Sequence, residues 1–336
     1  MTAGISLALG IDLGGSHIGV GVVDGTGKLI AREVVPTLVA AGPEGVIADL
    51  AGAARRIIVS LSDDRGSLVG AGVGVAALVD HRQGTVEMAP NLKWYGVPLK
   101  SILEEELGLP VLLENDANAA ALGENWVGAG AGTRHMICVT VGTGIGGGLI
   151  LGGRLHRGAG GFAGEVGHLR VAEDGPLCGC GRHGCLEAVA SATAMAREGA
   201  ALLARRLASG TGHDTPLGRL AEGDPARVNT RMLFEADRQG DGGAAEIINR
   251  AARFLGLGLA QAVNLLNPEV IVIGGGVGQA GERFLDPVRN ALATSALEEP
   301  ASRVRVVAAG LGTDAGILGA ASLFLNPDMV AAGPDL

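Results

Sequence analysis

Apolar and polar positions follow recurring patterns along the chain, and these patterns predict its secondary structure. Apolar residues at helical spacing predict helices over residues 41–60, 99–107, 116–126, 243–266 and 314–325. A continuous apolar run predicts a strand buried on both faces over residues 70–79, and further strands are predicted over residues 111–113, 270–273 and 304–308. Residues 209–224 are polar and rich in glycine, so we expect a surface loop there.

An internal repeat organises this pattern. Residues 9–16 and 137–144 each contain an apolar strand with a polar residue near its end (Asp12, Thr140), then a run of glycine with serine or threonine, and a further apolar strand follows. The repeat predicts an α/β chain of two lobes with a cleft between them. The glycine turns could present N–H groups to a polyphosphate or be ordinary hairpin turns. The polar residue at both turns favours phosphate binding.

The amino-acid composition limits the classes of molecule that we expect this chain to bind. Glycine occupies 58 of 336 positions, which allows close approach of the backbone to ligands and neighbouring strands. The net charge is −9, only three residues are lysine, and aromatic residues make up 2% of the chain. Broad nucleic-acid surfaces are basic and often use aromatic stacking, so we expect no nucleic-acid partner. Any phosphate is then bound locally, by backbone amides and metal ions.

Two stretches bear on membranes and on the cellular compartment. Residues 136–153 carry no charge, but seven of these eighteen residues are glycine and no basic flank marks an orientation. A buried pair of strands is therefore a better interpretation than a membrane span. Residues 1–10 lack the basic start and the cleavage site of a secretory leader. We expect a cytoplasmic protein with no membrane partner.

The cysteines indicate a metal site. Cys138 is isolated, whereas Cys178, Cys180 and Cys185 lie close together with glycines between them. Such spacing is typical of a metal cluster in a cytosolic chain, not of a secreted disulfide framework. With His168 ten residues before Cys178, the set offers three thiolates and one imidazole. Four such ligands close a tetrahedral site, which is typical of structural Zn²⁺.

Six segments resemble one known family and occur in its order. They are the turn 12–16, the segment 114–119 (ENDANA), the glycine run 142–148, the block 164–168 (GEVGH), the cysteine segment 178–187 and the turn 273–277. These segments resemble the ROK family of sugar kinases and of repressors derived from them. The resemblance implies a two-lobed actin-like ATPase (ribonuclease H-like) fold with a zinc-braced loop in the second lobe. It also implies ATP-dependent phosphorylation of a hexose, first of all D-glucose to glucose 6-phosphate.

The resemblance further implies how the chain is divided and what it binds. The smaller lobe is expected to comprise residues 1–115 and the helix 314–326. The larger lobe, residues 116–313, is expected to hold the zinc loop 165–187 and an adenosine-side turn at 273–277. A homodimer or homotetramer that binds a small-molecule sugar and a nucleotide is expected.

Site residues are carried over where this sequence matches the family's motifs. Asp116 is expected to be the general base that takes the proton of the sugar hydroxyl. Asp12 is expected to hold the Mg²⁺ of MgATP through water. Sugar hydroxyls are expected to bind Asn91, Asn115, Glu165, His168 and Glu187. The nucleotide is expected to bind Gly14, Gly15, Ser16, Thr143, Gly144, Gly275 and Gly276.

Some of these residues allow other interpretations. Asp116 could merely cap the helix that follows it. Pro90 and Asn91 could simply form a turn, without a role for Asn91 in binding. Residues 276–281 match the GxGxxG dinucleotide pattern, but no acidic residue closes a following strand, so we do not favour it. His17 stands where the family usually has lysine, and Ala76-Ala77 where it usually has Pro-Gly.

Other functions remain alternatives at this stage. A kinase for fructose, mannose or an N-acetylated hexosamine would use the same Glu165, His168 and Glu187. A sugar-responsive repressor is less favoured, because the first hairpin begins by residue 7 and the chain is acidic. A catalytically silent sugar sensor is disfavoured because Asp12 and Asp116 are both present.

Overall fold

The computed structural model describes residues 6–61 and 68–330, which form two compact units. The first unit comprises Met1–Cys138, Gly148–Gly164 and Gly310–Leu336, and the second comprises Val139–Gly147 and Glu165–Ala309. This division places the helix that begins at Asp116 in the first unit and not at the start of the other lobe, where the family resemblance would put it.

A five-stranded sheet lies at the centre of the first unit, with strand order β3-β2-β1-β4-β8. Its strands are β1 (Leu7–Leu13), β2 (His17–Asp24), β3 (Leu29–Pro36), β4 (Leu68–Val75) and β8 (Val111–Asn115). The first three are antiparallel, and β4 and β8 run parallel to β1. Because β1, β4 and β8 are parallel and in register, Asp12 of β1 pairs with Gly74 of β4, which pairs with Glu114 of β8.

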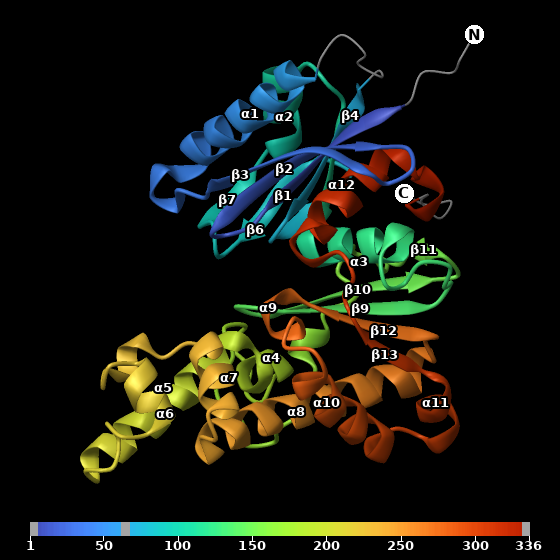
Figure 1. The fold of residues 1–336 in the computed structure, drawn as a ribbon. Coiled ribbons are helices and arrows are strands. Elements are labelled where there is room, and N and C mark those ends of the chain that lie inside the picture. Colours follow the sequence, from blue (N-terminus) through green and yellow to red (C-terminus); the bar gives the residue numbers. More distant parts are fainter. Residues whose placement is uncertain (1–5, 62–67, 331–336) are drawn as a thin grey trace. The chain divides into compact units, whose positions relative to one another are not determined.

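Helices cover both faces of this sheet (Figure 1). On one face lie α1 (Gly42–Ser60) and α2 (Leu99–Leu107), and on the other α3 (Asp116–Val127) and α12 (Ala315–Leu325). A smaller sheet is formed by β5 (Leu78–Asp80), β6 (Thr85–Ala89) and β7 (Trp94–Val97). Single 3₁₀ turns are η1 (Val39–Ala41), η4 (Gly312–Asp314) and η5 (Pro327–Met329).

Glycines let α12 lie directly on the sheet. A Cβ atom at Gly10 would come within 1.9 Å of the Ile317 carbonyl oxygen, and one at Gly72 within 1.8 Å of that of Ala320. No side chain larger than hydrogen fits such an approach. The high glycine content is therefore used in part for packing.

The second five-stranded sheet has the order β11-β10-β9-β12-β13, which repeats the order of the first. Its strands are β9 (Met136–Val141), β10 (Ile145–Leu151), β11 (Arg154–Leu155), β12 (Val270–Gly274) and β13 (Arg305–Ala308). The repeat seen in the sequence is confirmed, as is the α/β fold class. Residues 136–153, which carry no charge, are a strand pair as expected. Among the described residues, no helix is long and apolar enough to cross a membrane.

Most helices of the second unit lie between β11 and β12 in the chain. They are α4 (Leu186–Ala190), α5 (Ala192–Ala208), α6 (Pro216–Leu220), α7 (Thr230–Arg238) and α8 (Gly242–Leu266), with the 3₁₀ turns η2 (Val166–His168) and η3 (Pro225–Arg227). After β12 come α9 (Gly275–Gly278), α10 (Glu282–Ser295) and α11 (Glu298–Arg303). Helix α10 packs against α8 and contacts β13.

The predicted helices are confirmed to within one residue at each end, but two sequence predictions are wrong. The apolar run at residues 70–79 is not one strand, because β4 ends at Val75 and β5 starts at Leu78 after a turn. The segment 209–224 is not wholly a loop, because it contains α6. Thr215 caps that helix by accepting a hydrogen bond from the Gly218 N–H, and Pro216 occupies its first turn, where a missing N–H costs nothing.

Candidate active site and metal centre

The first glycine turn, residues 14–16, joins β1 to β2 in the first unit. The Gly14 N–H donates to the His17 carbonyl at 3.0 Å, which closes the turn. Thr37 braces it, because its hydroxyl donates to the Gly14 carbonyl at 2.8 Å and its N–H to the Ser16 carbonyl at 2.9 Å. Ser16 and His17 are exposed. The turn therefore has a defined shape and remains accessible, as a phosphate-binding turn must be.

Asp12 lies just before this turn, and its side chain lies against the start of α12. A Cβ atom at Gly316 would come within 2.6 Å of the Asp12 carboxylate carbon, so only glycine leaves room for this carboxylate. Burial, and secondly the negative charge of Asp116, raise the pKa of Asp12 from 3.8 to about 7. A cation bound beside Asp12 would offset both causes, which suits the Mg²⁺ role expected from the sequence.

Asp116 is the first residue of α3, and Asn115 is the N-cap. The Asn115 side-chain oxygen accepts hydrogen bonds from the N–H groups of Ala117 and Asn118, at 2.9 and 3.2 Å. The Asp116 carboxylate itself accepts from the Ala117 N–H at 2.9 Å. Since Asn115 provides the cap, a cap role is not needed to explain Asp116.

Gly74 of β4 brings the first turn of α3 close to the sheet. A Cβ atom there would lie 2.9 Å from the Ala119 side chain and 3.7 Å from the Asp116 Cα. Because Gly74 pairs with Asp12 in the sheet, this packing brings Asp12 and Asp116 close enough for their charges to interact. The first unit therefore brings together the two acidic residues predicted from the sequence.

The two asparagines expected to bind sugar differ in how their side chains are engaged. Asn115 donates a hydrogen bond from its side-chain amide to the Ala77 carbonyl at 3.2 Å. The backbone at Ala77, where the family usually has another residue, therefore still provides an acceptor. Asn91 is exposed in the turn after β6. A Cβ atom at Gly15 would lie 3.1 Å from the Asn91 Cβ, so Asn91 borders the first glycine turn. This turn was visible in the sequence, but its position beside Gly15 was not.

In the second unit, Thr143 and Gly144 form the turn between β9 and β10. The Gly142 N–H donates to the Gly144 carbonyl at 2.9 Å, and the Thr193 hydroxyl donates to the Thr143 carbonyl at 2.8 Å. Thr143 is exposed. The start of α5 thus braces this second turn, much as Thr37 braces the first.

The four predicted metal ligands converge. One ligand atom from each of His168, Cys178, Cys180 and Cys185 lies within 4.8 Å of all the others. The Cys180 and Cys185 Sγ atoms are 3.6 Å apart, and the His168 Nδ1 is 3.8 Å from the Cys178 Sγ. Tetrahedral zinc with Zn–S bonds of about 2.3 Å requires sulfur atoms about 3.8 Å apart. The donor set and its spacing therefore fit structural zinc.

The three remaining sugar-binding candidates surround this cluster. While the His168 Nδ1 faces the cysteines, its Nε2 lies 3.7 Å from the Glu165 carboxylate. Glu187 also borders the cluster, with one carboxylate oxygen 3.7 Å from the Cys178 Sγ. The structure thus groups Glu165, His168 and Glu187 around one loop. A metal on the Nδ1 would fix the tautomer, leaving the Nε2 as a hydrogen-bond donor.

A cavity of about 470 Å³ in the second unit contains part of the predicted adenosine-side turn. Gly275 has a φ of +78°, and its Cα lies so close to Val141 that a Cβ would be 2.4 Å from the Val141 carbonyl oxygen. Gly276, the next residue, lines the cavity. The other lining residues are Ala192, Thr230, Arg231, Phe234, Arg238, Val277, Gln279, Ala280 and Arg283. The lining residues from α7 and α10 have no motif that links them to Gly276 in the sequence.

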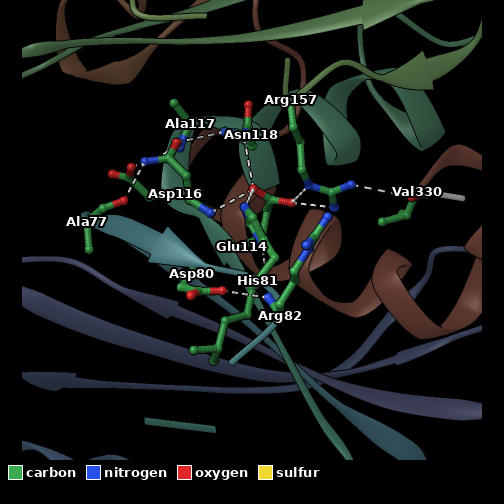
Figure 2. A network of polar contacts seen from close by, with 12 residues as sticks. Ala77, Asp80, His81, Arg82, Glu114, Asp116, Ala117, Asn118, Arg157 and Val330 are labelled. Atoms are coloured by element: carbon green, nitrogen blue, oxygen red, sulfur yellow. Dashed lines mark hydrogen bonds and ion pairs between the residues drawn. The ribbon is translucent and has the colours of Figure 1, made fainter. Parts of the chain in front are cut away.

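A buried ion pair that the sequence does not reveal lies where β8 meets α3 (Figure 2). Glu114 precedes both residues and forms an ion pair with Arg157, whose Nη2 is 2.6 Å from a carboxylate oxygen. Glu114 belongs to the segment 114–119 noted in the sequence, but its partner, 43 residues later in the chain, carries no local signal.

Comparisons with known proteins identify the family to which this chain belongs. The ROK family matches residues 8–326. The glucokinase of Streptomyces coelicolor is 39% identical over 97% of this chain and all of the relative, and that of Thermotoga maritima is 40% identical over 94% and 96%. The crystal structure of a ROK family glucokinase from Streptomyces griseus, in complex with glucose and AMPPNP, is 40% identical, with a TM-score of 0.83 over 95% of this chain and 99% of that one. The chain belongs to the ROK family.

Proposed function

We propose that this chain is a glucokinase, which transfers the γ-phosphoryl group of MgATP to the 6-hydroxyl of D-glucose. Two glucokinases at about 40% identity over nearly the full chain support this activity. The observation that carries the proposal is the arrangement around His168, whose two ring nitrogens face the cysteine cluster and Glu165. It supplies a braced set of hydrogen-bonding groups for a polyhydroxylated substrate.

In this proposal, Glu165, His168 and Glu187 bind sugar hydroxyls together with Asn91 and Asn115. Carboxylates accept from hydroxyl groups, amides both donate and accept, and the His168 Nε2 can donate. Zinc on His168, Cys178, Cys180 and Cys185 would supply no chemistry to the reaction, since its four positions are taken by protein ligands. Its contribution is to hold the loop in shape.

Asp116 is proposed to accept the proton of the sugar hydroxyl as that oxygen attacks phosphorus. A positioned base contributes about 10²–10⁴ in rate. Asp12 is proposed to hold the Mg²⁺ that accompanies ATP, which neutralises charge on the phosphates. The N–H groups of the two turns (Gly14, Gly15, Ser16, Thr143, Gly144) are proposed to donate to phosphate oxygens, with Gly275 and Gly276 beside the nucleoside.

The proposal also covers the cellular compartment and the oligomeric state of the protein. We place the protein in the cytoplasm as a homodimer or homotetramer. Light scattering on the purified full chain tests the oligomeric state.

A substrate panel tests the proposal. Initial rates are measured with glucose, fructose, mannose and N-acetylated hexosamines as acceptors, and with ATP, GTP and polyphosphate as donors. We expect the highest kcat/KM for glucose with ATP, by at least about tenfold, since one misfitted polar group in a hydrogen-bonding site costs at least that much. Preference for another hexose would replace glucose as the substrate, and no phosphorylation of any sugar would overturn the kinase assignment.

A further inference from the structure

Glu114 is a fully buried carboxylate at the end of β8, immediately before Asn115 and Asp116. One of its oxygens accepts hydrogen bonds from the Asn115 N–H and from the Asn118 side-chain amide, both at 2.9 Å. The other accepts from Arg157, with the Nε at 2.7 Å and the Nη2 at 2.6 Å (Figure 2). The buried charge is therefore both hydrogen-bonded and neutralised.

The two partners on the first oxygen lie on either side of Asp116 in the chain. Asn115 precedes Asp116 at the end of the strand, and Asn118 follows within the first helical turn. By holding both, the Glu114 carboxylate fixes the angle at which β8 enters α3. Asp116 lies at that corner, so these hydrogen bonds hold its backbone in place relative to the sheet.

Arg157 holds Glu114 in place from a different part of the chain. Its side chain is 10% exposed and also donates from the Nη1 to the Val330 carbonyl at 3.4 Å. His81 faces the same carboxylate, with its Nε2 at 3.7 Å, and its Nδ1 lies 3.1 Å from the Leu113 carbonyl oxygen. Three chain segments therefore meet at Glu114, and Val330 is joined to them through Arg157, all within the first unit.

We propose that Glu114 and Arg157 are a positioning pair for the reaction, which acts through Asp116 and rests on the role proposed above for that residue. Neither side chain is a catalytic residue here, because Glu114 is fully buried and Arg157 nearly so. A base that is misplaced by about 1 Å can lower the reaction rate by about 10²-fold. The position of the corner between β8 and α3 therefore affects kcat as well as stability.

The test removes both charges together, because removing one would leave the other buried and unpaired. In the full-length protein, E114Q/R157Q is compared with the wild type and with R157K, which keeps the charge but loses the planar fork. A matched control is R206Q/D241N in the second unit, where the two Arg206 nitrogens lie 2.9 Å from the oxygens of the nearly buried Asp241. Thermal unfolding, zinc content, kcat and both KM values are measured for each.

We expect E114Q/R157Q to lower kcat by 10- to 100-fold and to change the KM for ATP by less than twofold, with R157K in between. The control should lower the unfolding temperature with kcat within twofold of the wild type. Repeated in a D116N background, E114Q/R157Q should change the residual kcat by less than twofold, because a positioning pair has nothing left to position. Equal losses in both backgrounds, or a folded double variant with wild-type kcat, would overturn the positioning role.

Should E114Q/R157Q fail to fold, R157K in the two backgrounds decides the question by the same criterion. Failure of the proposed function looks different. A wild-type protein that phosphorylates no sugar, or a D116N variant with wild-type kcat, would overturn the assigned activity or base and the positioning role with it. An active wild type that needs Asp116 but not the pair would overturn the pair alone.

Discussion

The carboxylate of Glu187 accepts a hydrogen bond from the backbone N–H of Ile145, with 3.0 Å between the two atoms. Glu187 comes two residues after the predicted zinc ligand Cys185, and Ile145 ends the turn that holds Thr143 and Gly144. The Ala192 N–H makes a second link, by donating to the Gly142 carbonyl at 2.9 Å. The cysteine segment and the second glycine turn are therefore joined. A change in one of them should alter the affinity for the ligand that the other binds.

Loss of the metal should weaken the binding of both substrates. In Cys180→Ser we expect the zinc content to fall from about one ion per chain to near zero, and glucose affinity to fall at least about tenfold, because metal binding and local folding are coupled. Binding of a non-hydrolysable ATP analogue should also weaken, since Glu187 no longer braces the turn. Elemental analysis and calorimetry measure these quantities. Cys138→Ala, outside the cluster, is the control, and an unchanged glucose KM in zinc-free protein would contradict the prediction.

Gly144→Ala should displace Glu187 without touching a metal ligand. A Cβ atom at Gly144 would lie 2.2 Å from the Glu187 carboxylate oxygen, so that carboxylate must move away from the Ile145 N–H. Loss of a hydrogen bond to a charged group costs about 1.5–3 kcal/mol, which corresponds to a 10- to 100-fold higher KM for glucose. Zinc content should stay the same.

Gly179→Ala is the matched control for that experiment. It adds the same methyl group within the cysteine segment, where nothing lies within 4 Å of the new atom. We expect its KM values to stay within twofold of the wild type. If the KM for glucose of Gly144→Ala equals that of Gly179→Ala, the hydrogen bond between Glu187 and the turn does not contribute to sugar binding.

Asp116→Asn should lower kcat by about 10²–10⁴-fold, because the amide cannot take the hydroxyl proton. Zinc content, nucleotide binding and the unfolding temperature should stay close to those of the wild type, since Asn115 and not Asp116 caps α3. Steady-state kinetics and thermal unfolding check both statements. A variant that keeps more than about a tenth of the wild-type kcat would rule out Asp116 as the base.

Local signals explain why the sequence predicted some features well. The four metal ligands lie within residues 168–185, and short loops closed by hydrogen bonds such as that from the Cys178 N–H to the Arg182 carbonyl bring them together. The repeat was also readable, because each copy keeps its own strand–turn–strand pattern. Both features depend on neighbours in the chain, which a sequence shows directly.

Features that depend on distant contacts were not predicted. The sheet of β5, β6 and β7 has strands of only three to five residues, too short for a clear apolar period. Pro287 interrupts the pattern of α10, yet the helix continues through it. Arg157 offers no local sign that it neutralises Glu114, because the pair forms only when β8 and the segment after β11 pack together.

Asp12 should make the stability of the ligand-free protein depend on pH in an unusual direction. Its pKa is about 7 in the folded state and near 3.8 when unfolded, so between these values the folded state binds more protons. The free energy of unfolding should therefore fall as the pH rises from about 4 to 7, by at most about 1.4 kcal/mol per pH unit from this group. Above pH 7 Asp12 is ionised in both states and this contribution to the slope ends.

Other carboxylates act in the opposite sense, so the prediction concerns the difference between the wild type and Asp12→Asn. Denaturant unfolding of both proteins from pH 4.5 to 8, in buffer without added magnesium, gives that difference directly. We expect the wild type to lose stability relative to Asp12→Asn as the pH rises to 7, because the amide removes a carboxylate that burial and Asp116 make costly to ionise. Parallel pH profiles for the two proteins would show that the Asp12 carboxylate is no more costly to ionise in the fold than in the unfolded chain.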